Sequence, residues 1–228
     1  MTQAEGIEPA DGLRELQAVL VPDPRTHRNE LLADRQARIA QYQLIESVPH
    51  AVRVHFETAK NLYLYAWFVY RFHTVAETHA FATLEFALRE KLTFLFPDEF
   101  GPDAKRHPTL RSLFARARKE GLIANSGLRA AQRLPYERAR YRASIERGRE
   151  MLARGLTEIV YDDSDIQPLP EDFAVDALEV FQSTMPRIRN IHAHGSSMLY
   201  PTVLHTFEVV TDLINQLFPV PASDAQRL

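Results

Sequence analysis

Apolar side chains in the middle of the chain recur at intervals of three and four residues, the spacing of one face of an α-helix. Residues 50–96 carry this pattern and contain neither glycine nor proline. The pattern falls into two series, Val52, Phe56, Ala59, Tyr63, Ala66, Trp67 and Tyr70, and then Thr78, Phe81, Leu84, Leu88, Leu92 and Leu95. Thr74 and Glu77, which lie between the two series, have the spacing of a capping box, and this predicts that a second helix starts there. We therefore expect an antiparallel helical hairpin.

Further helices are predicted on both sides of this hairpin. A short helix near residues 13–20 and a polar helix over residues 27–47 precede it. Helices over residues 109–120, over 126–153, from Glu171 onward and from Pro201 to Pro219 follow it. The apolar face of the helix over residues 109–120 is Leu110, Leu113, Phe114 and Ala117. That of the helix from Glu171 is Phe173, Ala177, Phe181, Met185 and Ile188. That of the last helix is Val203, Phe207, Val210, Ile214 and Leu217. Pro135 should break or kink the helix over residues 126–153, because proline lacks the backbone N–H that a helix interior needs.

No segment has the alternation typical of a strand, so the expected fold class is all-α. We expect a helical bundle built on the hairpin, with an extra basic helical arm. Residues 1–48 would form an N-terminal arm and a polar helix, and residues 49–228 a helical domain with a basic insertion at about 105–156.

Composition narrows the class of protein. The 228 residues include eight glycines and no cysteine, which excludes thiol chemistry and argues against glycine-rich phosphate loops. The longest apolar run, Asn61 to Tyr70, is about half of a bilayer-spanning helix, so no membrane partner is expected. The N-terminal sequence is acidic and polar, unlike a secretory signal, and predicts a cytoplasmic protein.

Charge is distributed unevenly along the chain. Residues 105–154 hold 14 Lys or Arg and four Glu, a local charge of +10, whereas the rest of the chain sums to −13. Such a segment is typical of a surface that meets a polyanion, and Arg129, Arg133, Arg140 and Arg147 recur in it at helical spacing as candidate RNA-binding residues. The alternative is a solvated helix whose arginines form ion pairs with the acidic remainder.

The most distinctive short sequence is Pro186-Arg-Ile-Arg-Asn-Ile-His-Ala-His-Gly195. Within it, Arg189, Asn190 and His194 resemble the Arg-Asn-x-x-x-His signature of HEPN ribonuclease domains, which are small all-helical domains of RNA-targeting toxins and phage-defence effectors. Arg187 and His192 offer a competing register and are supporting candidates.

This resemblance implies metal-independent cleavage of RNA by 2′-hydroxyl transesterification. His194 would transfer protons, since imidazole titrates near neutrality. Arg189 would hold the phosphate and stabilise its developing charge, and Asn190 would orient either group. One histidine per chain is too few for both acid and base, so the resemblance also implies a homodimer with a composite cleft. An antitoxin or another regulatory protein is a further possible partner.

Two other kinds of polar residue are candidates for a role: a possible partner of Arg189, and possible metal ligands. Glu85 lies beside the apolar series of the hairpin and could pair with Arg189. His192 and His194 point about 200° apart on a helix and could not share an ion, while Asp162, Asp163 and Asp165 lack the remaining ligands of a calcium loop. We therefore expect no metal and no cofactor.

Two functions without catalysis stay open. The same fold with a degenerate site would be a module that binds RNA, a nucleotide or a protein. Alternatively, Arg189 and His194 could be a structural pair at a helix end, in a purely helical adaptor.

Overall fold

The computed structural model describes residues 11–26, 30–102, 108–160, 162–193 and 203–220. Within these ranges the chain is all-helical and contains no strand, as predicted. The α-helices are α1 (Leu32–Ala40), α2 (His50–Tyr65), α3 (Phe72–Leu95), α4 (Pro97–Phe100), α5 (Leu110–Lys119), α6 (Arg129–Arg154), α7 (Ala177–Ala193) and α8 (Val203–Leu217). Three short 3₁₀ helices are η1 (Leu16–Ala18), η2 (Asn125–Gly127) and η3 (Pro170–Ala174). No helix in these ranges is long and apolar enough to cross a membrane.

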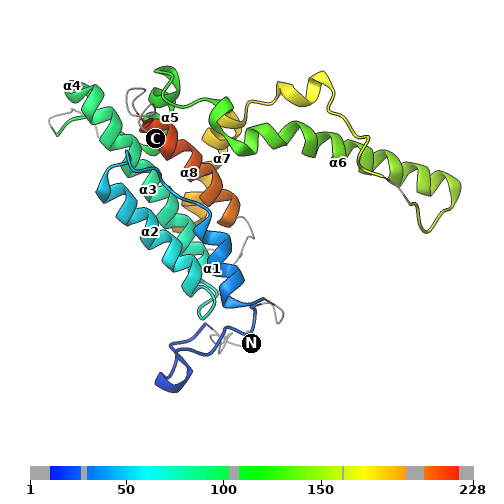
Figure 1. The fold of residues 1–228 in the computed structure, drawn as a ribbon, viewed down its shortest axis with the longest axis horizontal. Helices are drawn as coiled ribbons and strands as arrows, with labels where there is room; N and C mark the ends of the chain where they lie inside the picture. The colour runs from blue at the N-terminus through cyan, green and yellow to red at the C-terminus, as the bar shows by residue number, and fades with distance from the viewer. Residues whose placement is uncertain (1–10, 27–29, 103–107, 161, 194–202, 221–228) are drawn as a thin grey trace, which may run out of the picture.

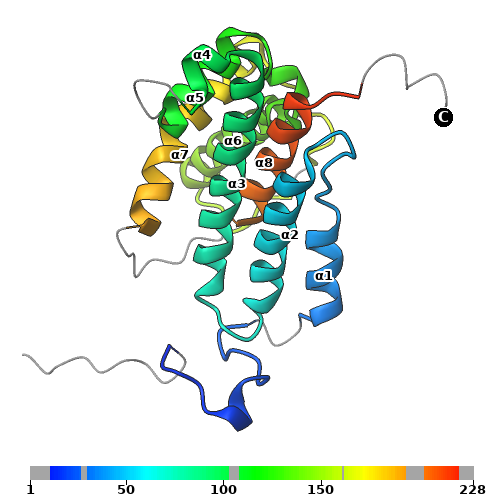
Figure 2. The ribbon, with the colours of Figure 1, turned by 90° about the vertical axis from the view of Figure 1, so that its left-hand side faces the viewer.

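The predicted hairpin is formed by α2 and α3, which run antiparallel side by side (Figures 1 and 2). The buried side chains of α2 belong to the first apolar series, but the helix ends at Tyr65, so Trp67 and Tyr70 lie half-buried in the turn. The predicted capping box was wrong. Helix α3 begins at Phe72, two residues earlier than Thr74, and Glu77 is buried within the helix instead of capping it.

Helix α8 lies at the centre of the bundle. All five of its predicted core residues are buried, and Thr206, Glu208 and Thr211 on other faces are buried as well. A helix that is covered on nearly every side must be surrounded by other helices. Helix α3 packs along it, α2 and α6 contribute neighbouring surfaces, and the ring of Phe207 contacts that of Phe56 at 5.6 Å between centroids.

Helix α5 matches its prediction closely. Thr109 precedes it in an extended conformation, and its hydroxyl accepts a 3.3 Å hydrogen bond from the backbone N–H of Ser112. This is the arrangement expected of an N-cap threonine. Gly121 follows the helix with φ of +69°, a conformation that favours glycine, and its position explains why the helix ends there.

The predicted basic arm is α6, which extends away from the bundle (Figure 1). Residues 155–160 and 162–176 run back along it toward α7, and we call α6 together with this return segment the arm. Pro135 does not break α6, so that part of the expectation was wrong. It is buried inside the helix, where its missing N–H leaves the Ala131 carbonyl without the usual helical donor.

The remaining differences concern helix starts. The helix near residues 13–20 is only η1, and the polar helix is limited to α1, whose Ile39 joins the central core. The helix expected from Glu171 is divided into η3 and α7, so Phe173 is 61% exposed instead of lining the core. The true start of α7 is set by Asp176, whose carboxylate accepts a 3.0 Å hydrogen bond from the N–H of Glu179.

Candidate functional site

The motif that resembles the HEPN signature coincides with the C-terminal end of α7. The backbone of α7 is helical through Arg187, Arg189, Asn190 and His192 and ends at Ala193. The side chains of these four residues, and His194 as a whole, lie outside the described part of the chain.

Helix α7 is fixed to the core by its apolar face. Met185 is completely buried, and the ring of Phe181 packs against those of Phe81 and Phe114, at centroid distances of 6.2 and 5.9 Å. Ile188, one residue before Arg189, is half-buried on the same side. The helix backbone that carries the motif is therefore held against α3 and α5.

Glu85 lies on α3, where its carboxylate accepts a 3.2 Å hydrogen bond from the guanidinium of Arg89 one turn away. Its side chain is 18% exposed, so it borders the core without being enclosed by it. The predicted contact with Arg189 stays a prediction, because that guanidinium is not described.

Two of the predicted RNA-binding arginines attach the arm to α8. Arg129 donates a 2.9 Å hydrogen bond to Asp212, and the Arg133 guanidinium donates to both carboxylate oxygens of Glu208, one of them at 2.7 Å. The hydrogen bonds from Arg133 lower the pKa of Glu208 despite its burial, because they stabilise the ionised carboxylate. These two arginines therefore form ion pairs with acidic residues of the protein itself, as the alternative interpretation of the basic segment expects.

The other two predicted arginines differ from each other. Arg147 donates a 2.9 Å hydrogen bond to Asp163 in the return segment, whereas Arg140 is exposed and forms no ion pair with any described residue. Arg149 is likewise exposed and without such a pair. Three of the four predicted arginines are thus paired with carboxylates, whereas Arg140 is not. Arg140 and Arg149 are the arginines of α6 that form no ion pair with a described residue, and we call them uncommitted.

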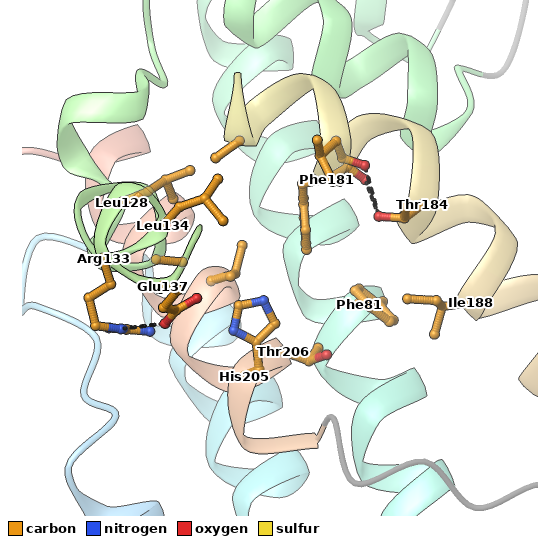
Figure 3. A pocket seen from close by; sticks show the side chains of 14 residues that line it. Phe81, Leu128, Arg133, Leu134, Glu137, Phe181, Thr184, Ile188, His205 and Thr206 are labelled. Carbon is orange, nitrogen blue, oxygen red and sulfur yellow. Dashed lines mark hydrogen bonds and ion pairs between the residues drawn. The ribbon is translucent and has the colours of Figure 1, made fainter. Parts of the chain in front are cut away.

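A groove separates the base of the arm from α7, with a cavity volume of about 280 Å³ (Figure 3). Its side chains come from α3, α6, α7 and α8. Phe181 and Ile188 form one apolar wall and Leu134 faces them from α6, while Glu137 and His205 bring polar groups to the rim. The sequence pattern did not reveal this groove, because it depends on how α6 leaves the bundle.

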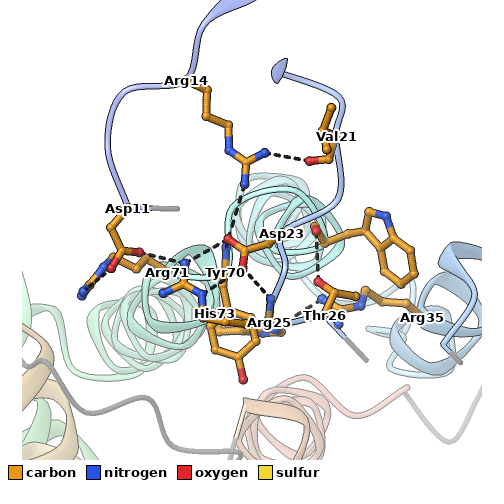
Figure 4. A network of polar contacts seen from close by, with 11 residues as sticks. Asp11, Arg14, Val21, Asp23, Arg25, Thr26, Arg35, Tyr70, Arg71 and His73 are labelled. Carbon is orange, nitrogen blue, oxygen red and sulfur yellow. Dashed lines mark hydrogen bonds and ion pairs between the residues drawn. The ribbon is translucent and has the colours of Figure 1, made fainter. Parts of the chain in front are cut away.

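A polar cluster at the turn of the hairpin was also missed (Figure 4). The side chain of Asp23 is fully buried and accepts hydrogen bonds from the Tyr70 N–H at 3.2 Å and from Arg25 at 2.9 Å. Asp11 pairs with Arg25 and with Arg71, each at 2.8 Å or less. Burial raises the pKa of Asp23, but the hydrogen bonds from Arg25 and Tyr70 outweigh it and lower the pKa overall. This cluster fastens residues 11–26 over the hairpin turn.

His73 lies beneath this cluster. Its Nε2 is 3.3 Å from the Arg35 guanidinium, which can only donate, so the ring proton lies on Nδ1. Nδ1 is buried without a partner among the described atoms. Burial, together with the charge of Arg35, lowers the pKa of His73 to about 4.

The described residues contain no group of three or more His, Asp or Glu side chains placed to hold a metal ion. His55 and His79 face each other with ring centroids 5.5 Å apart, but they are only two. Asp162 accepts a 2.8 Å hydrogen bond from the Ser164 N–H and Asp163 pairs with Arg147, so both carboxylates already have partners within the arm.

Comparison with protein-family models, with curated proteins and with solved structures finds no match to this chain. The relationship to HEPN domains is thus a hypothesis carried by the motif.

Proposed function

We propose that this chain is an endoribonuclease that cleaves RNA without a metal ion. The observation that carries the proposal is the sequence Arg189-Asn190-x-x-x-His194-Gly195, which spans the end of α7 in an all-helical chain. The anchoring of α7 against the core through Phe181 and Met185 supports it, because a catalytic group needs a rigid support.

In the proposed reaction, the ribose 2′-oxygen attacks the adjacent phosphorus and the bond to the 5′-oxygen breaks. His194 takes the 2′-hydroxyl proton or protonates the leaving oxygen, and Arg189 stabilises the charge on the phosphorane. Asn190 orients one of these groups. The products are a 2′,3′-cyclic phosphate and a free 5′-hydroxyl, so no other reactant is consumed.

The reaction needs both a base and an acid, and the motif contains one histidine in the proposed register. We propose that a second copy of the chain supplies the other, which requires a homodimer with its two α7 ends facing each other. Such an activity would suit a toxin or defence effector that an antitoxin restrains.

The arm supports RNA as the substrate through its uncommitted arginines. Arg140 and Arg149 are exposed on α6 and form no ion pair with described residues, so they are free to contact phosphates. If each neutralises one phosphate, the double variant Arg140→Gln/Arg149→Gln should bind single-stranded RNA more weakly. The slope of log K against log salt should become shallower by about 1.4.

Cleavage of a labelled single-stranded RNA in EDTA tests the proposal. Wild-type protein should produce the cyclic phosphate, and Arg189→Ala and His194→Ala should each lower the rate by about 100-fold or more. A substrate with 2′-deoxyribose at the cleaved position should be inert, because it lacks the nucleophile. Arg111→Ala, at an exposed position on α5, is the matched control and should keep full activity.

Three results would contradict the proposal. Undiminished cleavage by His194→Ala would remove the assigned proton-transfer group. Loss of activity in Arg187→Ala and His192→Ala alone would transfer the chemistry to the competing register. RNA binding without turnover by wild-type protein would identify a binding module instead of an enzyme.

A further inference from the structure

The groove between the base of the arm and α7 has the size of a site for one small planar group. Its volume of about 280 Å³ lies just below the lower limit of about 300 Å³ for pockets that hold drug-sized ligands. It is predominantly apolar, and the half-buried Phe181 contributes an aromatic side chain to its lining. Leu134 of α6 lies on the opposite side, and Ala130 of the same helix also lines the groove, so its apolar lining comes from both α6 and α7.

Polar groups gather at one edge of this apolar slot. The Glu137 carboxylate and the His205 imidazole stand at the rim, and the Arg133 guanidinium lies 3.7 Å from Glu137 (Figure 3). Unpaired bases of RNA are recognised in this way, by stacking on an aromatic side chain and by hydrogen bonds to their edges. We infer that the groove binds a single unpaired base of an RNA strand.

The position of the groove connects it with the proposed chemistry, and the inference rests on the proposed function for its substrate. Ile188 lines the groove and lies five residues before the end of α7, which is about 7.5 Å along the helix axis. That distance corresponds to about two stacked nucleotides at 3.4 Å each. A base held in the groove would therefore bring a neighbouring phosphodiester to the end of α7.

Glu137 also gives the groove a base preference. A carboxylate can only accept hydrogen bonds, and adenine, cytosine and guanine each present an exocyclic amino group, whereas uracil presents none. We expect RNA with an amino-bearing base at this position to bind about tenfold more tightly than RNA with uracil there.

A bulky residue at the groove rim tests the inference directly. Thr184 is exposed and lines the groove, whereas Ser183 is exposed on the same helix and does not line it. Thr184→Trp should fill the slot, and Ser183→Trp is the matched control. In a His194→Ala background, fluorescence anisotropy with labelled oligo(A), oligo(C) and oligo(U) should show at least tenfold weaker binding for Thr184→Trp alone.

Base preference provides a second readout. Glu137→Gln introduces an amide that both donates and accepts, so the preference for oligo(A) and oligo(C) over oligo(U) should disappear. Glu146→Gln, an exposed position further along α6 and outside the groove, should preserve it.

Equal RNA affinity of Thr184→Trp and Ser183→Trp, or no binding of single-stranded RNA at all, would overturn the inference. The two proposals can fail separately. If Thr184→Trp, with His194 intact, cleaves RNA as fast as wild-type protein, the nuclease proposal stands and the base site is contradicted. If wild-type protein does not cleave RNA but Thr184→Trp binds RNA more weakly than wild-type protein does, the base site is supported and the nuclease proposal is contradicted.

Discussion

The hydroxyl of Thr206 in α8 donates a 2.6 Å hydrogen bond to the carboxylate of Glu77 in α3, and both residues are buried. The contact joins the second helix of the hairpin to the central helix of the bundle. It is one of the interactions that stabilise Glu77 within the bundle, since a buried carboxylate without a donor would be strongly destabilising.

Replacing this hydroxyl should weaken the fold. Thr206→Val keeps the side-chain shape but removes this one hydroxyl donor, and should lower the free energy of unfolding by about 1–3 kcal/mol in urea denaturation. Thr211→Val is the control: its buried hydroxyl bonds to the Phe207 carbonyl of its own helix, which is already within the helical hydrogen-bond network. Equal losses in the two variants would contradict a special role for the contact between Thr206 and Glu77.

The prediction of the fold succeeded where local periodicity decides the structure. The apolar series of α5 and α8 marked residues that are all buried, and that of α3 marked the buried Phe81, Leu84, Leu88 and Leu92, since the hydrophobic face of a helix is visible from spacing alone. The α3 series was wrong at Leu95, which is the last residue of the helix and is 39% exposed, and Thr78 is only half-buried. Glu77 shows the limit of this approach. Its spacing from Thr74 is typical of a capping box, but the alternative role depends on Thr206, which is 129 residues away in the sequence.

The candidate site was predictable only in part, for the same physical reason. The basic charge on α6 was visible in the sequence. The sequence did not show that Arg133 pairs with Glu208 whereas Arg140 has no ion pair with a described residue. Asp23 gave no signal either, because its donors come from two separate segments of the chain. Long-range polar partners are chosen by tertiary packing, and a single sequence does not encode them in a short pattern.

The two kinds of arginine on α6 should differ in their effect on stability. Arg133→Gln breaks a bidentate pair with a mostly buried carboxylate and should cost about 1–2 kcal/mol, because Arg133 itself is half-exposed. Arg140→Gln should change stability by less than about 0.5 kcal/mol. The effect of Arg133→Gln should shrink as the pH falls below 4.5, since the lowered pKa of Glu208 means that its stabilising charge is lost there. A difference between the variants that does not change with pH would argue against the ion pair as its cause.

Asp23 should control how firmly residues 11–26 are held on the hairpin turn. Asp23→Ala removes the acceptor of Arg25 and of the Tyr70 N–H, so the segment should open more often. Trypsin should then cleave after Arg14 and Arg25 at least tenfold faster than in wild-type protein, as followed by mass spectrometry. Glu15→Ala, in the same segment but with a side chain that accepts a hydrogen bond from Gln17 and is not part of the cluster around Asp23, should be cleaved at the wild-type rate.

His73 should make the protein less stable in mild acid. Its folded-state pKa of about 4 is below the ordinary value of 6.5, so between these values the unfolded chain binds the proton more readily. The free energy of unfolding should therefore fall as the pH is lowered from 6.5 to 4, by about 2–3 kcal/mol from this group. His73→Gln removes the titration while its amide oxygen can still accept from Arg35, so urea denaturation should show a flatter pH dependence over this range. The exposed His50→Gln variant should keep the wild-type slope. An unchanged slope in His73→Gln would mean that the ring binds its proton equally well in the folded and unfolded chain, and that Arg35 and burial do not keep it neutral.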